Sequence, residues 1–154
     1  IVLWGDHGWN LGDSDLWAKH TPFERAVRSP LIISVPGMKH KGVSCDSLVE
    51  SLDLFPTLID LAKPSFTRIQ HSLDGKSLAG IFTNPKATVR DAALSYWRDG
   101  ITARTRTHRL IVTSKDGQLK NVELYDESTN FDPVINKASM EPDLVNKLKA
   151  YLPN

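Results

Sequence analysis

The chain has 154 residues, of which 40% are hydrophobic and 24% are charged, a balance typical of a globular protein with its own core. Lys and Arg number 19 and Asp and Glu number 18, so the formal net charge is +1. So small a charge gives no general attraction to nucleic acid or an anionic membrane, and no apolar stretch is long enough to span a bilayer. The single cysteine, Cys45, excludes an internal disulfide and leaves the compartment open.

The chain opens on a short apolar run, Ile1 to Trp4, that ends at Gly5. β-Branched residues in such a run predict a buried, parallel-type strand. Because neither an initiator Met nor a signal peptide precedes it, we expect a fragment or a processed piece of a longer protein. Residues 6–21 are rich in Gly, Asp and His without a clear period, which predicts a functional loop after the carboxyl end of that strand.

The next part of the chain predicts further α/β structure. The apolar run 30–35 is expected to be a second buried strand, and the mixed stretch 43–51 a short strand. Asp53 is the expected N-cap of a helix over 54–62, whose apolar side chains recur at helical spacing. A shorter helix is expected over 76–82.

The rest of the chain predicts short strands separated by turns. Four strands are expected, over 92–97, 100–107, 108–114 and 118–125. Asp99-Gly100 and Asp116-Gly117 are the strongest hairpin signals, and leucines spaced four residues apart predict a terminal helix over 141–152. The predicted fold class is therefore α/β, with a small antiparallel sheet and a C-terminal helix completing the chain.

The residues with the clearest chemical meaning are Asp6 and His7, which come directly after the first strand. A hard divalent cation prefers carboxylate oxygens, and a neighbouring imidazole can complete a mixed oxygen and nitrogen set. Gly5 and Gly8 flank the pair and permit the tight backbone that aims both side chains at one point. Two adjacent ligands cannot fill a metal's coordination sphere, and a polar turn after a strand is the alternative interpretation.

These residues begin a longer series of motifs. In chain order the series is Asp6-His7-Gly8-Trp9, Leu11-Gly12, Leu16-Trp17-Ala18-Lys19, Arg28-Ser29-Pro30-Leu31, Val35-Pro36-Gly37, Asp74-Gly75-Lys76-Ser77-Leu78 and Glu123-Leu124-Tyr125-Asp126. The series resembles the sulfatase family of the alkaline-phosphatase superfamily, and its first motifs are similar to those of the iduronate-2-sulfatase-like branch. The resemblance implies that residues 1–85 are the end of an alkaline-phosphatase-like α/β catalytic core. Residues 86–154 would then be a small C-terminal subdomain of antiparallel sheet and helix.

The resemblance also implies roles for residues of the first loop. Asp6 and His7 match the family's late pair of calcium-site residues, with Mg²⁺ as the alternative ion. Lys19 matches the lysine that contacts the sulfate group, so it is the expected catalytic and sulfate-binding residue. Trp9 falls where iduronate-type members place an aromatic side chain near the sugar, and His20, beside Lys19, is a further substrate-binding candidate.

Ordinary structural roles compete with these. Lys19 could be a solvated surface lysine, and the aromatic rings of the loop could be core residues, which is the preferred interpretation for Trp17. Glu24 is expected to form a structural ion pair with Arg25 or Arg28.

A basic cluster stands in the second half of the chain, at Arg104, Arg106, His108 and Arg109. If alternate residues of one strand share a face, Arg104, Arg106 and His108 line up and could grip an acidic sugar. A solvated strand face is the preferred alternative.

The nucleophile that the resemblance implies is not in this sequence. Sulfatases use a formylglycine made from Cys or Ser in a Cys-X-Pro/Ser-X-Arg motif, whereas Cys45 has no arginine four positions later. The formylglycine is therefore expected in an N-terminal portion of the same protein. Cys45 is expected to be a structural thiol, buried or partly exposed.

The resemblance thus implies the C-terminal part of a sulfatase that hydrolyses sulfate esters on a carbohydrate, by a metal-assisted formylglycine mechanism. The expected partners are a sulfated carbohydrate or another small sulfate ester and the N-terminal portion, with no nucleic acid and no membrane. The alternatives are a phosphoryl or phosphonate ester hydrolase of the same superfamily and a non-catalytic sulfatase-like fragment. The family's members also suggest export or a lysosomal location.

Overall fold

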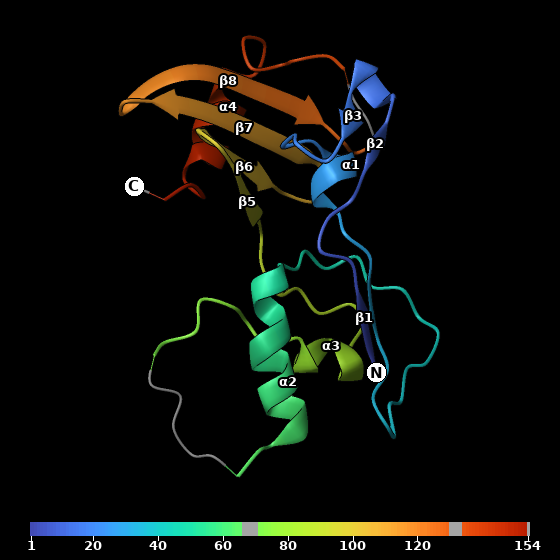
Figure 1. The fold of residues 1–154 in the computed structure, drawn as a ribbon. Coiled ribbons are helices and arrows are strands. Elements are labelled where there is room, and N and C mark those ends of the chain that lie inside the picture. Colours follow the sequence, from blue (N-terminus) through green and yellow to red (C-terminus); the bar gives the residue numbers. More distant parts are fainter. Residues whose placement is uncertain (66–70, 130–133, 154) are drawn as a thin grey trace. The chain divides into compact units, whose positions relative to one another are not determined.

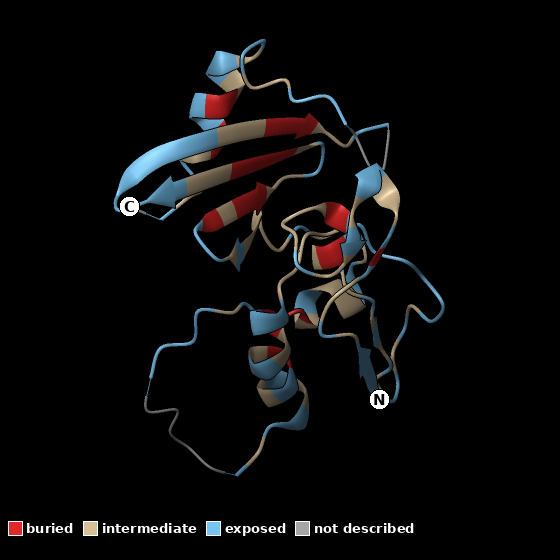
Figure 2. Cartoon of the chain, turned by 45° about the horizontal axis from the view of Figure 1, so that its top comes forward, coloured by how far each residue is buried: buried red, intermediate tan, exposed pale blue. Residues whose placement is uncertain are grey.

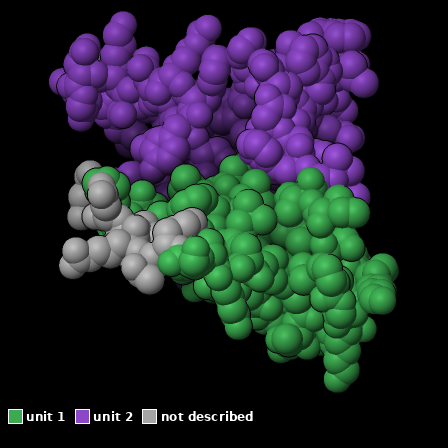
Figure 3. Space-filling view, turned by 60° about the horizontal axis from the view of Figure 1, so that its bottom comes forward, with its two compact units in different colours: residues 1–2, 33–91 green, residues 3–32, 92–154 purple. Residues whose placement is uncertain are grey.

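A computed structural model describes residues 1–65, 71–129 and 134–153 of the chain. Its residues gather into two units that are each assembled from separate stretches of sequence. Unit 1 comprises residues 1–2 and 33–91, and unit 2 comprises residues 3–32 and 92–154 (Figure 3). The predicted domains, 1–85 and 86–154, stay a prediction.

Unit 1 is built around helix α2, Leu54–Ala62, which has the predicted bounds. A 3₁₀ helix, η2 (Ser51–Asp53), leads into it, and α3 (Ala79–Thr83) is the shorter second helix. Asp53 precedes α2 as predicted, but its side chain does not cap that helix. The fully buried carboxylate instead accepts hydrogen bonds from the backbone nitrogens of Glu50 and Lys76, at 2.8 and 2.7 Å, and pairs with Arg90.

One further expectation for unit 1 was wrong. No strand forms over the described residues 43–51, where a loop runs into η2. The apolar stripe of α2 is only partly covered, since Leu58 is 45% exposed. The residue of α2 that is buried is Thr57, whose hydroxyl accepts a hydrogen bond from the backbone nitrogen of Leu78 at 2.8 Å. Polar contacts therefore join α2 to the segment that leads into α3.

The two predicted buried strands pair with each other but are largely exposed. They are β1 (Val2–Trp4) and β4 (Leu31–Ile33), which form a two-stranded sheet. Leu3 and Ile32 are each 61% exposed. The prediction that these strands are buried is therefore wrong for this chain, because apolar composition alone does not supply the layers that would cover a sheet.

Unit 2 contains the predicted antiparallel sheet and terminal helix (Figure 1). The strands are β5 (Ala93–Trp97), β6 (Gly100–Arg104), β7 (His108–Lys115) and β8 (Gln118–Asp126), and the helix is α4 (Pro142–Lys149). Strand order follows chain order, as expected for successive hairpins.

The two hairpin signals act differently. Asp116 and Gly117 form the two-residue loop between β7 and β8, with φ values of 54° and 72°. Positive φ at both positions gives the tight turn that matches strand twist. In the other hairpin Gly100 already pairs with Trp97, so the loop consists of Arg98, at φ 52°, and Asp99. The hairpin is as predicted, but its turn lies one residue earlier than the Asp-Gly pair.

Alternation along the strands gives the sheet two buried faces. Leu110 and Leu124 are register partners, and both are fully buried against Val145 and Leu148 of α4. The residues next to them, including Arg109, point to the opposite face. That face is covered by the segment around α1 (Glu24–Val27). In Figure 2 many of the buried residues of unit 2 lie on β6, β7, β8, α4 and α1.

No helix among the residues that the structure describes is both long and apolar enough to cross a membrane.

Candidate active site

The loop that carries Asp6 and His7 is pressed against helix α1. The backbone nitrogen of Gly8 donates to the carbonyl oxygen of Ala26 at 2.7 Å. A Cβ atom at Gly8 would lie 1.9 Å from the carbonyl oxygen of Arg25, which is well inside van der Waals contact. Only glycine permits this close approach of two backbones.

The following residues form a small hairpin rather than an irregular loop. Strands β2 (Asn10–Leu11) and β3 (Trp17–Ala18) pair antiparallel across the 3₁₀ turn η1 (Asp13–Asp15). Asn10 is 1% exposed, and its amide nitrogen donates to the carbonyl oxygen of Ala18 at 2.7 Å and to Thr21 Oγ1 at 3.2 Å. Asn10 therefore holds the residues on both sides of Lys19.

This hairpin brings Lys19 back to His7. The Lys19 Nζ atom lies 2.8 Å from His7 Nε2, and the nearest oxygen of the Asp6 carboxylate lies 3.5 Å from the same nitrogen. The structure thus brings together the three residues that the sequence predicted for the metal and sulfate site. The Asp6 side chain is 75% exposed and that of His7 is 30% exposed, so both remain accessible.

The hydrogen bonds of His7 define its tautomer. Its Nδ1 atom lies 2.7 Å from the carbonyl oxygen of Gly8, which can only accept, so Nδ1 carries the proton. Nε2 then presents a lone pair to the ammonium group of Lys19. A neutral imidazole that is oriented by a carbonyl on one nitrogen and offers the other is the usual form of a metal-binding histidine.

The aromatic residues near this site take three different positions. The ring of Trp9 lies 6.0 Å from that of His7 and is 51% exposed, so it is free to contact a ligand. Trp17 is 70% exposed, so the prediction of a core residue is wrong. Trp97, at the end of β5, stacks on His20 with ring centroids 4.8 Å apart.

A buried ion network lies between the sheet and the segment after Lys19. Arg109 pairs with Glu24 and, through Nε at 2.6 Å, with Glu127. Arg104 contacts the same two carboxylates, at 3.1 and 2.6 Å. Arg109 also donates to the carbonyl oxygen of Pro22 at 3.2 Å, which fixes the backbone three residues after Lys19.

The two carboxylates of this network differ in acidity. Burial opposes ionisation of Glu24, but the neighbouring Arg109 and Arg104 outweigh it and lower the pKa of Glu24. Burial raises the pKa of Glu127 above its ordinary value, although Arg109 opposes the change. Glu127 is therefore the first of the pair to take up a proton as the pH falls.

The predicted ion pairs of α1 are confirmed in part. Arg28 lies 3.6 Å from Glu24, whereas Arg25 pairs with Asp13 at 3.2 Å. The strongest partners of Glu24 are the two arginines of the sheet, which the sequence did not predict.

The predicted alignment of the basic cluster is wrong. Strand β6 ends at Arg104 and β7 begins at His108, so a turn separates them and they are not alternate residues of one strand. Arg104 is occupied by the buried network, and Arg106 is exposed on the turn. The cluster therefore divides into two structural arginines, Arg104 and Arg109, the exposed Arg106, and the half-buried His108, whose Nδ1 lies 2.8 Å from Thr107 Oγ1.

The described residues offer two side chains of the kind that bind divalent cations. Asp6 and His7 contribute one carboxylate and one imidazole nitrogen, and no group of three or more His, Cys, Asp or Glu side chains gathers within residues 1–65, 71–129 and 134–153. Calcium takes about six to eight oxygen ligands, so these two fit as members of a larger set. Cys45 is exposed, so the prediction of a buried or partly exposed thiol is wrong.

Sequence reasoning missed three residues that shape the site. Buried Asn10 gave no signal, because a lone asparagine in a polar loop is normally solvated. Trp97 lies far along the chain, and only tertiary structure brings it to His20. Arg109 was noticed as part of a basic cluster, but its burial could not be inferred from charge pattern.

Comparison with known proteins agrees with the features described above. A family model described as N-sulphoglucosamine sulphohydrolase, C-terminal, matches residues 5–152. The chain belongs to this family. A sulfatase of Formosa agariphila is 31% identical over 156 residues, covering 99% of this chain and 29% of that protein. Iduronate 2-sulfatase of Mus musculus is 34% identical over 86 residues, covering 40% of this chain and 16% of that protein.

The fold of this sulfatase C-terminal domain is also found among solved structures. A protein solved in complex with its substrate D-glucosamine-2-N,6-O-disulfate superposes with a TM-score of 0.84 at 23% identity. The match covers 97% of this chain and 32% of that one. The chain thus spans less than a third of the length of each of these relatives.

Proposed function

We propose that this domain is part of a sulfatase that hydrolyses sulfate esters of a carbohydrate, in which Asp6, His7 and Lys19 form one side of the active site. The observation that carries the proposal is the convergence of Lys19 Nζ and the Asp6 carboxylate on His7 Nε2, at 2.8 and 3.5 Å. A carboxylate, a neutral imidazole and an ammonium group meet there on an accessible surface. The family to which the chain belongs supplies the reaction class.

Lys19 is suited to bind the sulfate group. Its ammonium has three donors, and only one of them is directed at His7 Nε2. The remaining donors can bind anionic oxygens, and a compact positive charge stabilises the negative charge that grows during sulfate ester cleavage. Asn10 donates hydrogen bonds to the residues on both sides of the Lys19–His20 segment, Ala18 and Thr21, so the backbone at Lys19 is held in place before substrate arrives.

Asp6 and His7 would hold a divalent cation, with Ca²⁺ expected and Mg²⁺ as the alternative. When bound, such an ion acts as a Lewis acid toward a sulfate oxygen. His7 Nε2 has one lone pair, so a cation bound there would displace the Lys19 ammonium group and leave it free to bind the anion. The remaining ligands and the formylglycine nucleophile would come from an N-terminal portion of the same protein.

The substrate is proposed to be a sulfated sugar. Trp9 is half exposed beside His7, where an aromatic ring can pack on the apolar face of a pyranose. The resemblance to the iduronate-2-sulfatase-like branch supports a uronate-containing substrate. The glucosamine disulfate bound by the structural relative supports an amino sugar, and both are sulfated monosaccharide units.

The test is hydrolysis by the full-length protein that carries this chain, with sulfated monosaccharides and matched phosphate esters as substrates. We expect sulfate release to be lost in Asp6→Ala and to fall by about 100-fold or more in Lys19→Ala, the scale of losing one preorganised oxyanion contact. Lys120→Ala is the matched control, because Lys120 is exposed and its ammonium donates a hydrogen bond to the Gln118 side chain, on a strand of the sheet that does not line the site.

The outcomes separate the alternatives. Near-normal sulfate release in Asp6→Ala with metal still bound would refute the assignment. Faster release of phosphate than of sulfate by the unsubstituted protein would favour a phosphoryl ester hydrolase. Metal content, measured by elemental analysis of dialysed protein, should fall in Asp6→Ala and stay unchanged in Lys120→Ala.

A further inference from the structure

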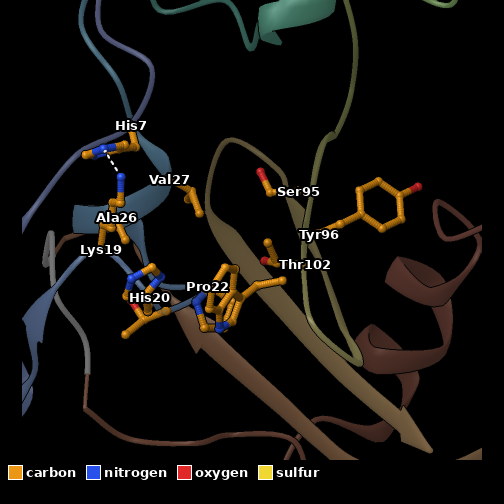
Figure 4. Close-up of a pocket in the computed structure, with 11 residues that line it drawn as sticks. His7, Lys19, His20, Pro22, Ala26, Val27, Ser95, Tyr96 and Thr102 are labelled. Atoms are coloured by element: carbon orange, nitrogen blue, oxygen red, sulfur yellow. Dashed lines mark hydrogen bonds between the residues drawn. The ribbon is translucent and has the colours of Figure 1, made fainter.

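A cavity of about 240 Å³ opens beside Lys19 within unit 2. Its walls come from the segment that carries Lys19 and His20, from α1, and from β5 and β6, so residues far apart in sequence meet in it (Figure 4). Whole small-molecule pockets occupy roughly 300–1,000 Å³, so this cavity suits one ring rather than an oligosaccharide. Its walls are mainly apolar, but hydroxyls of Ser95 and Thr102 and the imidazole of His20 are part of them.

The position of the cavity fits the shape of a sulfate ester. If Lys19 binds the anionic group, the organic part of the substrate must extend from it into neighbouring space. The cavity is such a space, because Lys19 and His7 lie on its wall. A mixture of apolar surface, hydroxyls and an imidazole suits a sugar, whose ring has apolar C–H faces and hydroxyl edges.

His20 is the wall residue best placed to recognise a hydroxyl group. It follows Lys19 directly, its side chain is exposed, and no hydrogen bond joins its ring to another of the described residues. One face of its ring packs on Trp97, with centroids 4.8 Å apart and an angle of 28° between the planes. Trp97 is in turn held by the β5–β6 hairpin, where it pairs with Gly100.

We propose that Trp97 is a positioning residue that holds the His20 imidazole in this cavity, where His20 binds a hydroxyl or amide of the sugar ring that bears the sulfate. Trp97 acts through His20 rather than on the reacting atoms. This inference rests on the proposed function. It adds a subsite for the sugar ring, distinct from the exposed Trp9, and names the aromatic residue that shapes it.

An aromatic residue outside the cavity wall provides a matched control. Tyr151 follows helix α4, is 37% exposed and is not one of the residues that line the cavity. Tyr151→Ala removes an aromatic ring from the same unit without touching the stack of His20 and Trp97. Trp97→Phe is the conservative variant, because it keeps an aromatic surface for His20.

The experiment measures kcat and KM of the full-length protein for its best sulfated monosaccharide, together with the inhibition constant of inorganic sulfate. We expect Trp97→Ala and His20→Ala each to lower kcat/KM by about 3- to 10-fold, the scale of one aromatic pair or one hydrogen bond, mainly through KM. Trp97→Phe should stay within about twofold of the unsubstituted protein, as should Tyr151→Ala. The double variant His20→Ala/Trp97→Ala should be no worse than the poorer single variant, because both changes remove one interaction.

Inorganic sulfate distinguishes positioning from general damage to the site. Its inhibition constant should not change in any of these variants, since Lys19 is intact. A parallel rise of the sulfate inhibition constant in Trp97→Ala would overturn the inference, as would additive losses in the double variant or unchanged kcat/KM. If the unsubstituted protein cleaves a sulfated monosaccharide but Trp97→Ala leaves kcat/KM unchanged, this inference fails alone. If it cleaves no sulfate ester, the proposed function fails as well.

Discussion

Replacing Arg109 by methionine tests the buried ion network between the sheet and the Lys19 segment. The Arg109 side chain is 1% exposed and forms ion pairs with Glu24 and Glu127. It also donates hydrogen bonds to the Pro22 carbonyl oxygen and to Thr102 Oγ1. Methionine fills similar space but removes the charge and every donor. The two carboxylates, 7% and 2% exposed, would then share Arg104, and only Glu24 would keep a second arginine, Arg28, at 3.6 Å.

The expected loss of stability in Arg109→Met comes mainly from the two buried carboxylates that lose a positive partner, rather than from the contacts that Arg109 itself made. Removing one partner of a buried ion pair typically costs about 3–5 kcal/mol, because a buried charge is left uncompensated. That corresponds to a roughly 100- to 5,000-fold rise in the population of locally open molecules. Hydrogen–deuterium exchange of the full-length protein should show the rise in peptides covering residues 19–27 and 108–115, which the network joins.

Two companion variants make the result decisive. Arg106→Met removes the same kind of side chain from an exposed position on the next turn, and should change protection by less than about 0.5 kcal/mol. Adding Glu127→Gln to Arg109→Met should recover part of the loss, because it removes one of the stranded charges. A change of less than about tenfold in Arg109→Met, or no recovery in the double variant, would refute the reasoning.

Two further substitutions test local features of unit 2. Gly8→Ala should abolish sulfate release, because its Cβ would meet a backbone carbonyl oxygen of α1 at 1.9 Å. Gly80→Ala is the control and should leave activity unchanged, because the space around Gly80 is open. Equal activities of the two variants would contradict this prediction. Hydrogen bonds from Ser128 and Lys137 lower the pKa of Asp126 below its ordinary value. The ionised Asp126 therefore stabilises the folded state fully at pH values above the ordinary pKa of an aspartate, and this stabilisation is lost as the pH falls through the lowered pKa. Asp126→Asn should therefore lower the thermal midpoint at pH 7, with a difference that shrinks below about pH 4, and a difference that grows in acid would refute the assignment.

The strands and helices of unit 2 were predicted closely because their signals are local. The hairpin β7–β8 follows from Asp116-Gly117, where only residues that tolerate positive φ can turn the chain. Helix α4 follows from leucines spaced four residues apart, of which Leu148 is buried on the sheet. Such patterns depend on a few neighbouring residues, so they predict an element correctly even when the rest of the fold is not known.

The prediction failed where it depended on what covers a segment. The apolar run at Val2–Trp4 forms a strand, yet it is exposed in this chain. Trp17 was assigned to the core and is 70% exposed. A residue's hydrophobicity indicates that it can be buried, but burial requires a second layer whose presence a local pattern does not report.

The sequence by itself determined the motif order that led to the family, the residues Asp6, His7 and Lys19, and the strand and helix pattern of the second half. Only tertiary structure decided that Lys19 meets His7, that Trp97 packs on His20, and that Arg109 lies buried beside Glu24, 85 residues away. The physical reason is that charge and aromatic character are properties of single residues. Burial and pairing are properties of the space between segments, which chain folding alone creates.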